Sequence, residues 1–367
     1  MTGQQAGARL RLARQARGFS QQQLARMALV SRQAVSAVET GLSDPSLRVA
    51  LTLSRALGLT VEELFGPAMP EPSVPVRALA PLGGEGSRVS LAPMGEDFVA
   101  LPLSGAAATR AGFGPAGGRV SGPRRVVPLG PRRPTLVVAG CDPALPLLEL
   151  PLSLLDPPVA FLWWPCASEE ALGLAAGGLV HVAGAHLRGQ SGDYNTGPAG
   201  ELLREGADVI GFCSWREGLV LRPEQAAKVG DVAGVVSAGL RLVNREPGAE
   251  ARRVLDRELA SLGVSGPGLA GYDTTVAGHL EVAAAIAAGL ADAGVASEPA
   301  ALAYGLAFVP LTEERFDLVI PASQTGTREV QGLLRVLSSS WLLGQLGSLP
   351  GYDVTQCGER IATLPPG

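Results

Sequence analysis

Hydrophobic and polar positions between residues 18 and 41 follow a helical spacing in two short segments. Leu24 and Ala25 face one side of the first segment, and Val35 and Val38 face one side of the second, three to four residues apart. This spacing predicts two helices that each bury one face. The opposite face of each helix remains for a partner.

Serine residues mark the expected start of each helix. Ser20 and Ser31 stand where a side-chain oxygen can accept from the unpaired N–H groups of a first turn, and Gly41 follows the second helix. Two helices joined by a tight turn form the geometry that places the second helix in a DNA major groove. On the outward face of that helix, Arg32 and Gln33 can make bidentate bonds to guanine and adenine edges.

Positive charge is concentrated in the same part of the chain. Residues 1–66 contain eight arginines against four acidic residues, a net charge of +4, whereas the remainder has 22 basic and 30 acidic residues, a net charge of −8. The cation excess therefore lies where contacts to DNA phosphates would need it. A solvated amphipathic helical bundle is the alternative interpretation of these helices.

Residues 6–65 resemble the Cro/C1-type helix-turn-helix repressors, also called the XRE family. The resemblance rests on the segments Phe19-Ser20-Gln21, Val35-Ser36-Ala37-Val38-Glu39-Thr40-Gly41, Asp44-Pro45-Ser46-Leu47 and Val61-Glu62-Glu63-Leu64-Phe65. It implies an all-α domain over residues 1–66 that binds a double-stranded DNA operator, and a structural role for Glu39. The expected DNA contacts are Arg17, Gln21, Arg32, Gln33, Ser36 and Ala37.

The composition changes to proline, glycine and alanine over residues 67–133, which predicts a linker. Within it, two apolar runs between residues 88 and 104 flank Gly95-Glu96-Asp97, a hairpin-like pattern that predicts a small β unit. The pairs Arg124-Arg125 and Arg132-Arg133 either solubilise the linker or contact the DNA backbone.

From residue 134 to residue 360, short β-branched runs alternate with alanine-rich and leucine-rich segments. The strands are expected at residues 136–139, 159–164, 180–187, 209–212 and 240–243, and helices at residues 144–150, 169–174 and 249–262. This alternation predicts an α/β domain with mainly parallel strands. Small ligands bind such domains at the carboxyl ends of the strands, where helix N-termini favour negative charge.

Most of residues 134–335 resembles the periplasmic-binding-protein-like domain that certain bacterial regulators carry behind a helix-turn-helix, with relatives described as molybdate-binding. The motifs include Ala139-Gly140-Cys141-Asp142-Pro143, Gly192-Asp193-Tyr194-Asn195, Trp215-Arg216-Glu217-Gly218-Leu219 and Asn244-Arg245-Glu246-Pro247-Gly248. The implied fold class is multidomain, an all-α helix-turn-helix bundle followed by a two-lobed α/β binding-protein-like (type II) domain. We expect the ligand between the lobes and the crossing strands near Phe212 and Phe308.

Polar residues at strand ends and in loops are the candidate ligand contacts of this domain. They are Asp142, His186, Tyr194, Asn195, Arg216 and Arg245. Each has a structural alternative, since Asp142 and His186 can cap neighbouring backbone, Tyr194-Asn195 can fix a turn, and the two arginines can pair with Glu217 or Glu246.

One segment departs from the pattern of oxyanion-binding members of this fold. Those members often present Ser or Thr hydroxyls at the helix start after the asparagine-arginine motif, where this chain has Ala249-Glu250-Ala251. The carboxylate of Glu250 repels an anion there unless Arg245 or Arg252 offsets its charge.

Other chemistry is not indicated by the sequence. The four cysteines (Cys141, Cys166, Cys213 and Cys357) lack CxxC pairing, and the three histidines have no nucleophile motif beside them. We therefore expect no metal, no cofactor and no catalysis. The apolar run over residues 282–291 is too short to span a bilayer, so we expect a cytoplasmic protein without a membrane partner.

These observations predict a transcriptional regulator that binds an operator as a homodimer and senses a small-molecule effector, molybdate or another oxyanion. One alternative is a carrier of a small molecule or molybdenum species with a vestigial DNA-binding domain. Another is a constitutive repressor whose cleft binds nothing.

Overall fold

The computed structural model describes residues 3–66, 72–105, 114–189 and 193–367. The chain divides into two compact units, Met1–Ser73 and Val74–Gly367, each with its own core. Among the described residues, every helix is either too short or too polar to cross a membrane.

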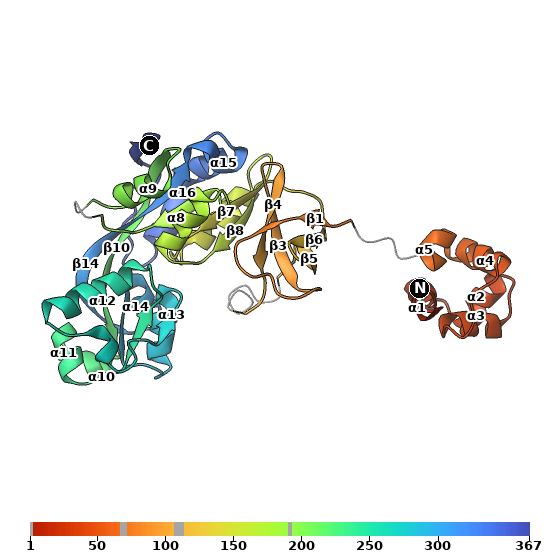
Figure 1. The fold of residues 1–367 in the computed structure, drawn as a ribbon, viewed down its shortest axis with the longest axis horizontal. Helices are drawn as coiled ribbons and strands as arrows, with labels where there is room; N and C mark the ends of the chain where they lie inside the picture. The colour runs from red at the N-terminus through yellow and green to blue at the C-terminus, as the bar shows by residue number, and fades with distance from the viewer. Residues whose placement is uncertain (1–2, 67–71, 106–113, 190–192) are drawn as a thin grey trace. The chain divides into compact units, whose positions relative to one another are not determined.

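Where it is described, the first unit is a bundle of five helices (Figure 1): α1 (Gly3–Ala16), α2 (Gln21–Met27), α3 (Arg32–Glu39), α4 (Leu47–Leu57) and α5 (Val61–Phe65). Both predicted helix starts are confirmed, because Ser20 Oγ accepts from the N–H of Gln23 at 3.2 Å and Ser31 Oγ from that of Ala34 at 3.1 Å. The side chains that the spacing places inward are buried: Leu24, Ala25, Val35 and Val38.

The second unit begins with a six-stranded sheet in the order β1-β6-β5-β3-β4-β2. Its strands are β1 (Val74–Pro75), β2 (Arg77–Ala78), β3 (Arg88–Met94), β4 (Asp97–Pro102), β5 (Gly118–Gly122) and β6 (Arg125–Pro128). The predicted linker, residues 67–133, therefore contains more strands than the single small β unit that was expected. Strands of two residues are too short to show the apolar and polar alternation by which a strand is predicted. Residues 67–71 and 106–113 of that predicted linker lie outside the described residues.

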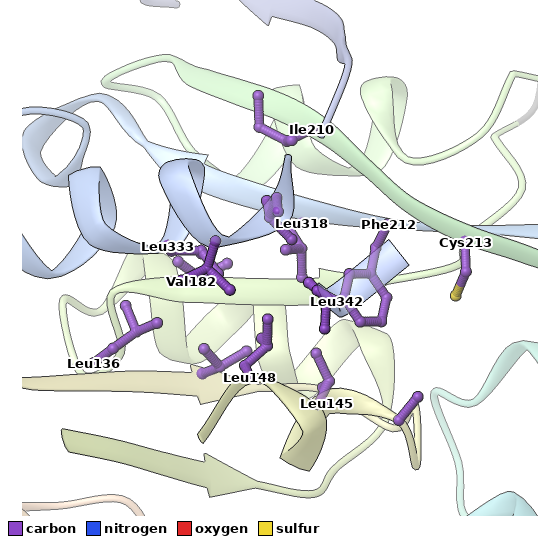
Figure 2. Packing of buried hydrophobic residues seen from close by; sticks show 14 of the residues in the cluster. Leu136, Leu145, Leu148, Val182, Ile210, Phe212, Cys213, Leu318, Leu333 and Leu342 are labelled. Atoms are coloured by element: carbon purple, nitrogen blue, oxygen red, sulfur yellow. The ribbon is translucent and has the colours of Figure 1, made fainter. Parts of the chain in front are cut away.

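One lobe of the α/β domain combines the first three strands of a larger sheet with the end of the chain. It contains β7 (Thr135–Ala139), η1 (Leu145–Leu148), α7 (Glu149–Ser153), β8 (Ala160–Trp164), α8 (Ser168–Ala176), β9 (Val182–Ala185), α9 (Thr196–Leu202), η3 (Ala322–Gln324), α15 (Arg328–Leu337), α16 (Ser340–Gly347) and β15 (Arg360–Leu364). Figure 2 shows how side chains from its strands and helices, including Leu136, Leu148, Val182 and Leu333, point toward one another in its core.

The other lobe also packs helices against short parallel strands. It contains α10 (Pro223–Ala226), α11 (Val232–Ser237), β11 (Leu242–Arg245), α12 (Glu250–Ser261), η2 (Gly266–Gly268), β12 (Thr275–Val276), α13 (His279–Ala287), β13 (Ala293–Ser297) and α14 (Glu298–Ala303). A separate set of apolar side chains, among them Leu219, Val254, Leu255 and Val295, forms its core.

Two antiparallel strands of 15 residues each, β10 (Ala207–Leu221) and β14 (Ala307–Pro321), run through both lobes (Figure 1). They include the expected crossing points, Phe212 and Phe308. The larger sheet has the order β12-β11-β13-β10-β14-β9-β7-β8. Ala185 at the end of β9 pairs with Asp317, and Ser297 at the end of β13 pairs with Glu217. The carboxyl ends of the parallel strands of both lobes therefore point toward the middle of the crossing strands.

Candidate DNA interface and interlobe ligand site

The expected base-contacting residues lie together on α3. Arg32 and Gln33 are exposed in its first turn, and Ser36 and Ala37 are half-buried one turn later. Arg17 is exposed just after α1, where its guanidinium donates to the carbonyl of Ala13 at 3.2 Å. This placement leaves the polar start of α3 accessible to a partner, as major-groove recognition requires.

The carboxylate of Glu39 connects the first three helices. It accepts from Arg14 Nε at 2.6 Å and from Gln21 Nε2 at 2.9 Å, and Arg14 Nη1 also donates to the carbonyl of Phe19 at 2.6 Å. Burial alone would raise the pKa of Glu39, but the bonds from Arg14 and Gln21 outweigh it and lower that pKa. Glu39 therefore has a structural role, and part of the Gln21 amide is used inside the domain.

Five buried titratable side chains meet between the lobes, and we call them the interlobe cluster. Cys141 follows β7, His186 follows β9, His279 begins α13, and Glu217 and Glu314 lie in the middle of the crossing strands. Each position follows from the topology, because both lobes direct their strand ends to this point.

The distances within the interlobe cluster are short. Cys141 Sγ lies 3.8 Å from His279 Nε2, and His186 Nδ1 lies 3.6 Å from Glu314 Oε2 and 4.0 Å from Glu217 Oε2. His279 Nδ1 lies 3.5 Å from Glu217 Oε1 and accepts a hydrogen bond from the backbone N–H of Ser297 at 3.2 Å.

Many polar atoms at this place have no hydrogen-bond partner among the described residues. They include both ring nitrogens of His186, all four carboxylate oxygens of Glu217 and Glu314, Arg245 Nη1, Trp215 Nε1 and Ser297 Oγ. Buried polar groups are paired in the large majority of cases, and leaving one unpaired costs roughly 1–3 kcal/mol. So many unpaired atoms in one place indicate a site that a ligand completes.

Burial also shifts the protonation of the interlobe cluster. It raises the pKa of Glu217 to about 8 and raises that of Glu314, and it places the pKa of His279 well below its usual range, further lowered by the charge of Arg245. Burial would lower the pKa of His186 too, but the neighbouring Cys141 and Glu314 outweigh it and raise that pKa. Burial therefore disfavours the charged forms of both Glu217 and His279.

A cavity of about 310 Å³ leads to the interlobe cluster from the surface. Its walls come from both lobes and include Cys141, Cys166, Trp163, Arg245 and His279. A small ligand has room to enter along this path, since a drug-sized site starts at roughly 300 Å³.

Of the six predicted ligand contacts, His186 lies in the interlobe cluster and Arg245 lines the cavity. Arg245 is buried, and its Nε and Nη2 donate to Glu246 at 2.8 Å each, the pairing that the sequence left open. Arg216 instead pairs with Glu298, with 2.8 Å between Nε and Oε2, and is half-exposed.

Asp142 and Asn195 are bonded within their own lobe. Asp142 Oδ1 accepts from the N–H of Ala144 at 2.7 Å, so it caps the turn after β7, and burial raises its pKa to about 6. Asn195 has a left-handed φ of 64°, and its Oδ1 accepts from the N–H of Leu187 at 2.7 Å. These bonds correspond to the structural alternatives.

Tyr194 lies beside this turn. Its hydroxyl donates to the carbonyl of Glu313, and its ring contacts the guanidinium of Arg315. Gly192 of the same motif lies outside the described residues. These contacts give Tyr194 a role in fixing the loop against β14.

The sequence does not identify Glu217, His279 and Glu314 as ligand contacts, and it marks Cys141 only as one of four cysteines without CxxC pairing. Cys141 follows an expected strand, so the strand-end rule could have identified it. His279 begins a helix after the two-residue strand β12, and the glutamates lie inside long strands, where no local pattern marks them.

The departure at the start of α12 has a structural counterpart. Glu250 is fully buried, and its Oε1 accepts from Arg257 Nη1 at 2.8 Å. A carboxylate therefore stands at the helix N-terminus where oxyanion-binding relatives are expected to present a hydroxyl.

Two family models match this chain. The model described as "PBP superfamily domain" matches residues 152–338, and the model described as "Helix-turn-helix" matches residues 10–64. Both families are of regulator or binding-protein type.

Relatives match separate parts of the chain. The protein YvgK of Bacillus subtilis (strain 168) is 27% identical over 186 residues, which are 50% of this chain and 60% of that protein, so the match leaves part of YvgK uncovered. The HTH-type transcriptional regulator MJ0272 of Methanocaldococcus jannaschii is 35% identical over 57 residues, 16% of this chain and 86% of that protein.

A solved structure matches the helical unit. The restriction-modification controller protein C.AhdI from Aeromonas hydrophila is 40% identical and covers 17% of this chain and 96% of its own, with a TM-score of 0.17.

Proposed function

Since this chain belongs to the PBP superfamily and begins with an XRE-type helix-turn-helix domain, we propose that it is a sequence-specific transcriptional regulator whose operator affinity depends on a small ligand. Residues 1–66 bind the operator, and residues 134–360 sense the ligand. The observation that carries the proposal is the set of unpaired buried polar atoms between the lobes.

The ligand acts by favouring one arrangement of the lobes. The crossing strands β10 and β14 are the main connection between the lobes, and the interlobe cluster has members on both sides of it. A ligand that contacts His186 from one lobe and His279 from the other binds the closed arrangement more tightly than an open one. This difference in affinity is the free energy available to change DNA binding.

The operator is read by a homodimer. Arg32, Gln33, Ser36 and Ala37 contact bases in the major groove, while Arg17 and Gln21 contact phosphates. A helix-turn-helix dimer places two recognition helices one turn of DNA apart, roughly 34–36 Å. Because its proposed partner is operator DNA, the protein acts in the cytoplasm.

Fluorescence anisotropy of the full chain on DNA from its own upstream region tests the proposal. Arg32→Ala is expected to weaken operator binding by roughly 1–3 kcal/mol and to relax base preference, because it removes a base contact. Arg17→Ala is expected to weaken all sequences alike and to reduce the salt slope by about 1. Arg204→Ala, an exposed arginine of the second unit, is the control. Equal effects of Arg32→Ala on operator and random DNA would contradict the assignment.

An oxyanion such as molybdate is one candidate ligand. Unpaired donors on Arg245, Trp215 and Ser297 support it, whereas the carboxylates of Glu217 and Glu314 oppose it. A thermal-shift titration with molybdate and phosphate tests this candidate. A ligand that stabilises the protein without changing operator affinity would instead indicate a carrier.

A further inference from the structure

Three side chains of the interlobe cluster form a set that could hold a metal ion. Ligand atoms of Cys141, His186 and His279 lie within 4.8 Å of one another, and all three residues are buried. In a tetrahedral zinc site, a sulfur and a nitrogen ligand lie about 3.6 Å apart. Cys141 Sγ and His279 Nε2 are 3.8 Å apart, so only a small adjustment separates them from that geometry.

The two glutamates lie where they can orient the imidazoles. His186 Nδ1 is 3.6 Å from Glu314, and His279 Nδ1 is 3.5 Å from Glu217. In metalloproteins, the ring nitrogen that does not bind the metal usually donates to a carboxylate or a carbonyl. When His279 Nε2 binds the metal, the ring proton must be on Nδ1. Nδ1 then donates to Glu217 and no longer accepts from the Ser297 N–H.

The acidic side chains behind the set favour a cation, and the charge of the nearby Arg245 is paired with Glu246. Each ring of the set offers one nitrogen to a metal ion when it is neutral, and the carboxyl oxygens of Glu217 and Glu314 behind the rings have no hydrogen-bond partner in the described part of the chain. A divalent cation supplies positive charge to these oxygens, whereas an anion adds negative charge beside two buried acidic side chains. Sulfur and imidazole ligands select late transition metals over Mg²⁺ or Ca²⁺.

We propose that Cys141, His186 and His279 bind a divalent transition-metal cation of the zinc type, with Glu217 and Glu314 as positioning residues. The cavity lined by Cys141 and His279 gives the ion its path from solvent. This inference rests on the proposed function in one respect, because it names the class of effector that the interlobe site senses.

Cobalt(II) replaces zinc as a spectroscopic probe in the first experiment. Titration of the full chain with Co²⁺ is expected to produce a thiolate-to-cobalt charge-transfer band that saturates at one ion per chain, and Zn²⁺ is expected to remove it. Mg²⁺ is expected to leave the band unchanged. A wild-type protein without this band overturns the proposal, and this readout needs no variant.

Matched variants assign the ligands. Cys141→Ser is expected to abolish the charge-transfer band, and Cys357→Ser, which changes a half-buried thiol bonded to the Leu337 carbonyl, is expected to retain it. A band that persists in Cys141→Ser overturns the assignment. Circular dichroism and thermal unfolding of each variant establish that the fold is intact.

One histidine variant removes a proposed ligand and keeps the backbone contact that the side chain makes without metal. In His279→Asn, the amide oxygen still accepts from the Ser297 N–H, but the nitrogen that faces Cys141 is gone. We expect at least a tenfold loss of Co²⁺ affinity, about the size that outer-shell changes alone produce. His181→Asn, which likewise keeps an acceptor for the Val137 N–H, is the control and is expected to bind Co²⁺ as the wild type does.

Operator binding with and without Zn²⁺ separates this inference from the proposed function. If Co²⁺ binds through Cys141 but Zn²⁺ leaves operator affinity unchanged, the metal site stands and the sensing function fails. If an oxyanion changes operator affinity and Co²⁺ gives no thiolate band, the sensing function stands and the metal site fails.

Discussion

Glu39 shows how one residue connects helices whose sequences are separated by turns. Glu39 belongs to α3, and its carboxylate accepts from Arg14 of α1 and from Gln21 at the start of α2. The exposed fraction of Glu39 is 5%, so the bonds are largely shielded from water. The position of α3 against α1 and α2 therefore depends on the Glu39 carboxylate, which lies eighteen positions from Gln21 and twenty-five positions from Arg14 in the sequence.

Glu39→Gln is expected to reduce the amide-exchange protection of α1 and α3 at pH 7, by about 1.5–3 kcal/mol, since it weakens bonds to a charged group. The pKa of Glu39 is below its ordinary 4.5, so its stabilisation is present above that pH and is lost as the pH falls through the folded pKa. The difference between wild type and variant is thus expected to shrink below pH 4.5. Exchange measured by mass spectrometry on the full chain checks both results.

Glu62→Gln is the matched control for this prediction. Glu62 is an exposed acid in the first turn of α5. Its replacement is expected to leave protection within about 0.5 kcal/mol of the wild type. A pH-independent loss in Glu39→Gln would contradict the role assigned to the charge.

At the scale of elements, the crossing strands determine where the site lies. β10 and β14 change register between Glu217 and Gly218, next to the interlobe cluster. A β-bulge redirects a side chain and increases the local twist. The carboxylate of Glu217 consequently depends on how closely the two strands approach at Gly218.

Gly218→Ala is expected to destabilise the second unit by roughly 1–3 kcal/mol and to weaken ligand binding between the lobes. A Cβ at this position would overlap the carbonyl oxygen of Val309 and lie 2.9 Å from Phe308 Cζ. Calorimetric unfolding and Co²⁺ titration measure the two effects. Gly200→Ala is the control, since its Cβ meets no described atom within 4 Å, and an equal loss in both variants would contradict this account.

The sequence predicted most parallel strands because each is a short apolar run, as at β7 and β8. It did not predict the length of β10. Only residues 209–212 show the apolar run of a strand, whereas β10 continues to Leu221 past two adjacent polar residues, Arg216 and Glu217. A strand that crosses between two lobes carries polar side chains where it passes the ligand site. In β10 these polar residues interrupt the apolar pattern by which a strand is predicted from sequence.

At the scale of the whole molecule, the interlobe cluster is a product of topology. Cys141 and His279 are 138 positions apart in the sequence, and their contact exists only because β7 and α13 belong to lobes that face each other. Local patterns could identify His186 and Arg245 as candidates at strand ends. They could not pair Cys141 with a histidine, because no spacing rule relates residues from two separate lobes.

If the interlobe site and the operator site are coupled, the coupling is reciprocal. An effector that changes operator affinity by some factor must have its own affinity changed by operator DNA by the same factor, for allosteric systems about 5–150-fold.

With Zn²⁺ as effector, we expect saturating operator duplex to shift the Zn²⁺ dissociation constant of the full chain. The expected factor equals the one by which saturating Zn²⁺ shifts the dissociation constant of the operator duplex. Competition against a chelating dye, with and without the duplex at fixed salt, measures this shift. In Arg32→Ala, the free protein is expected to bind Zn²⁺ normally and to need a higher duplex concentration for the same shift, because Arg32 is a proposed DNA contact outside the interlobe cluster. A scrambled duplex controls for charge, and a Zn²⁺ affinity that the operator leaves unchanged would show that the two units act independently.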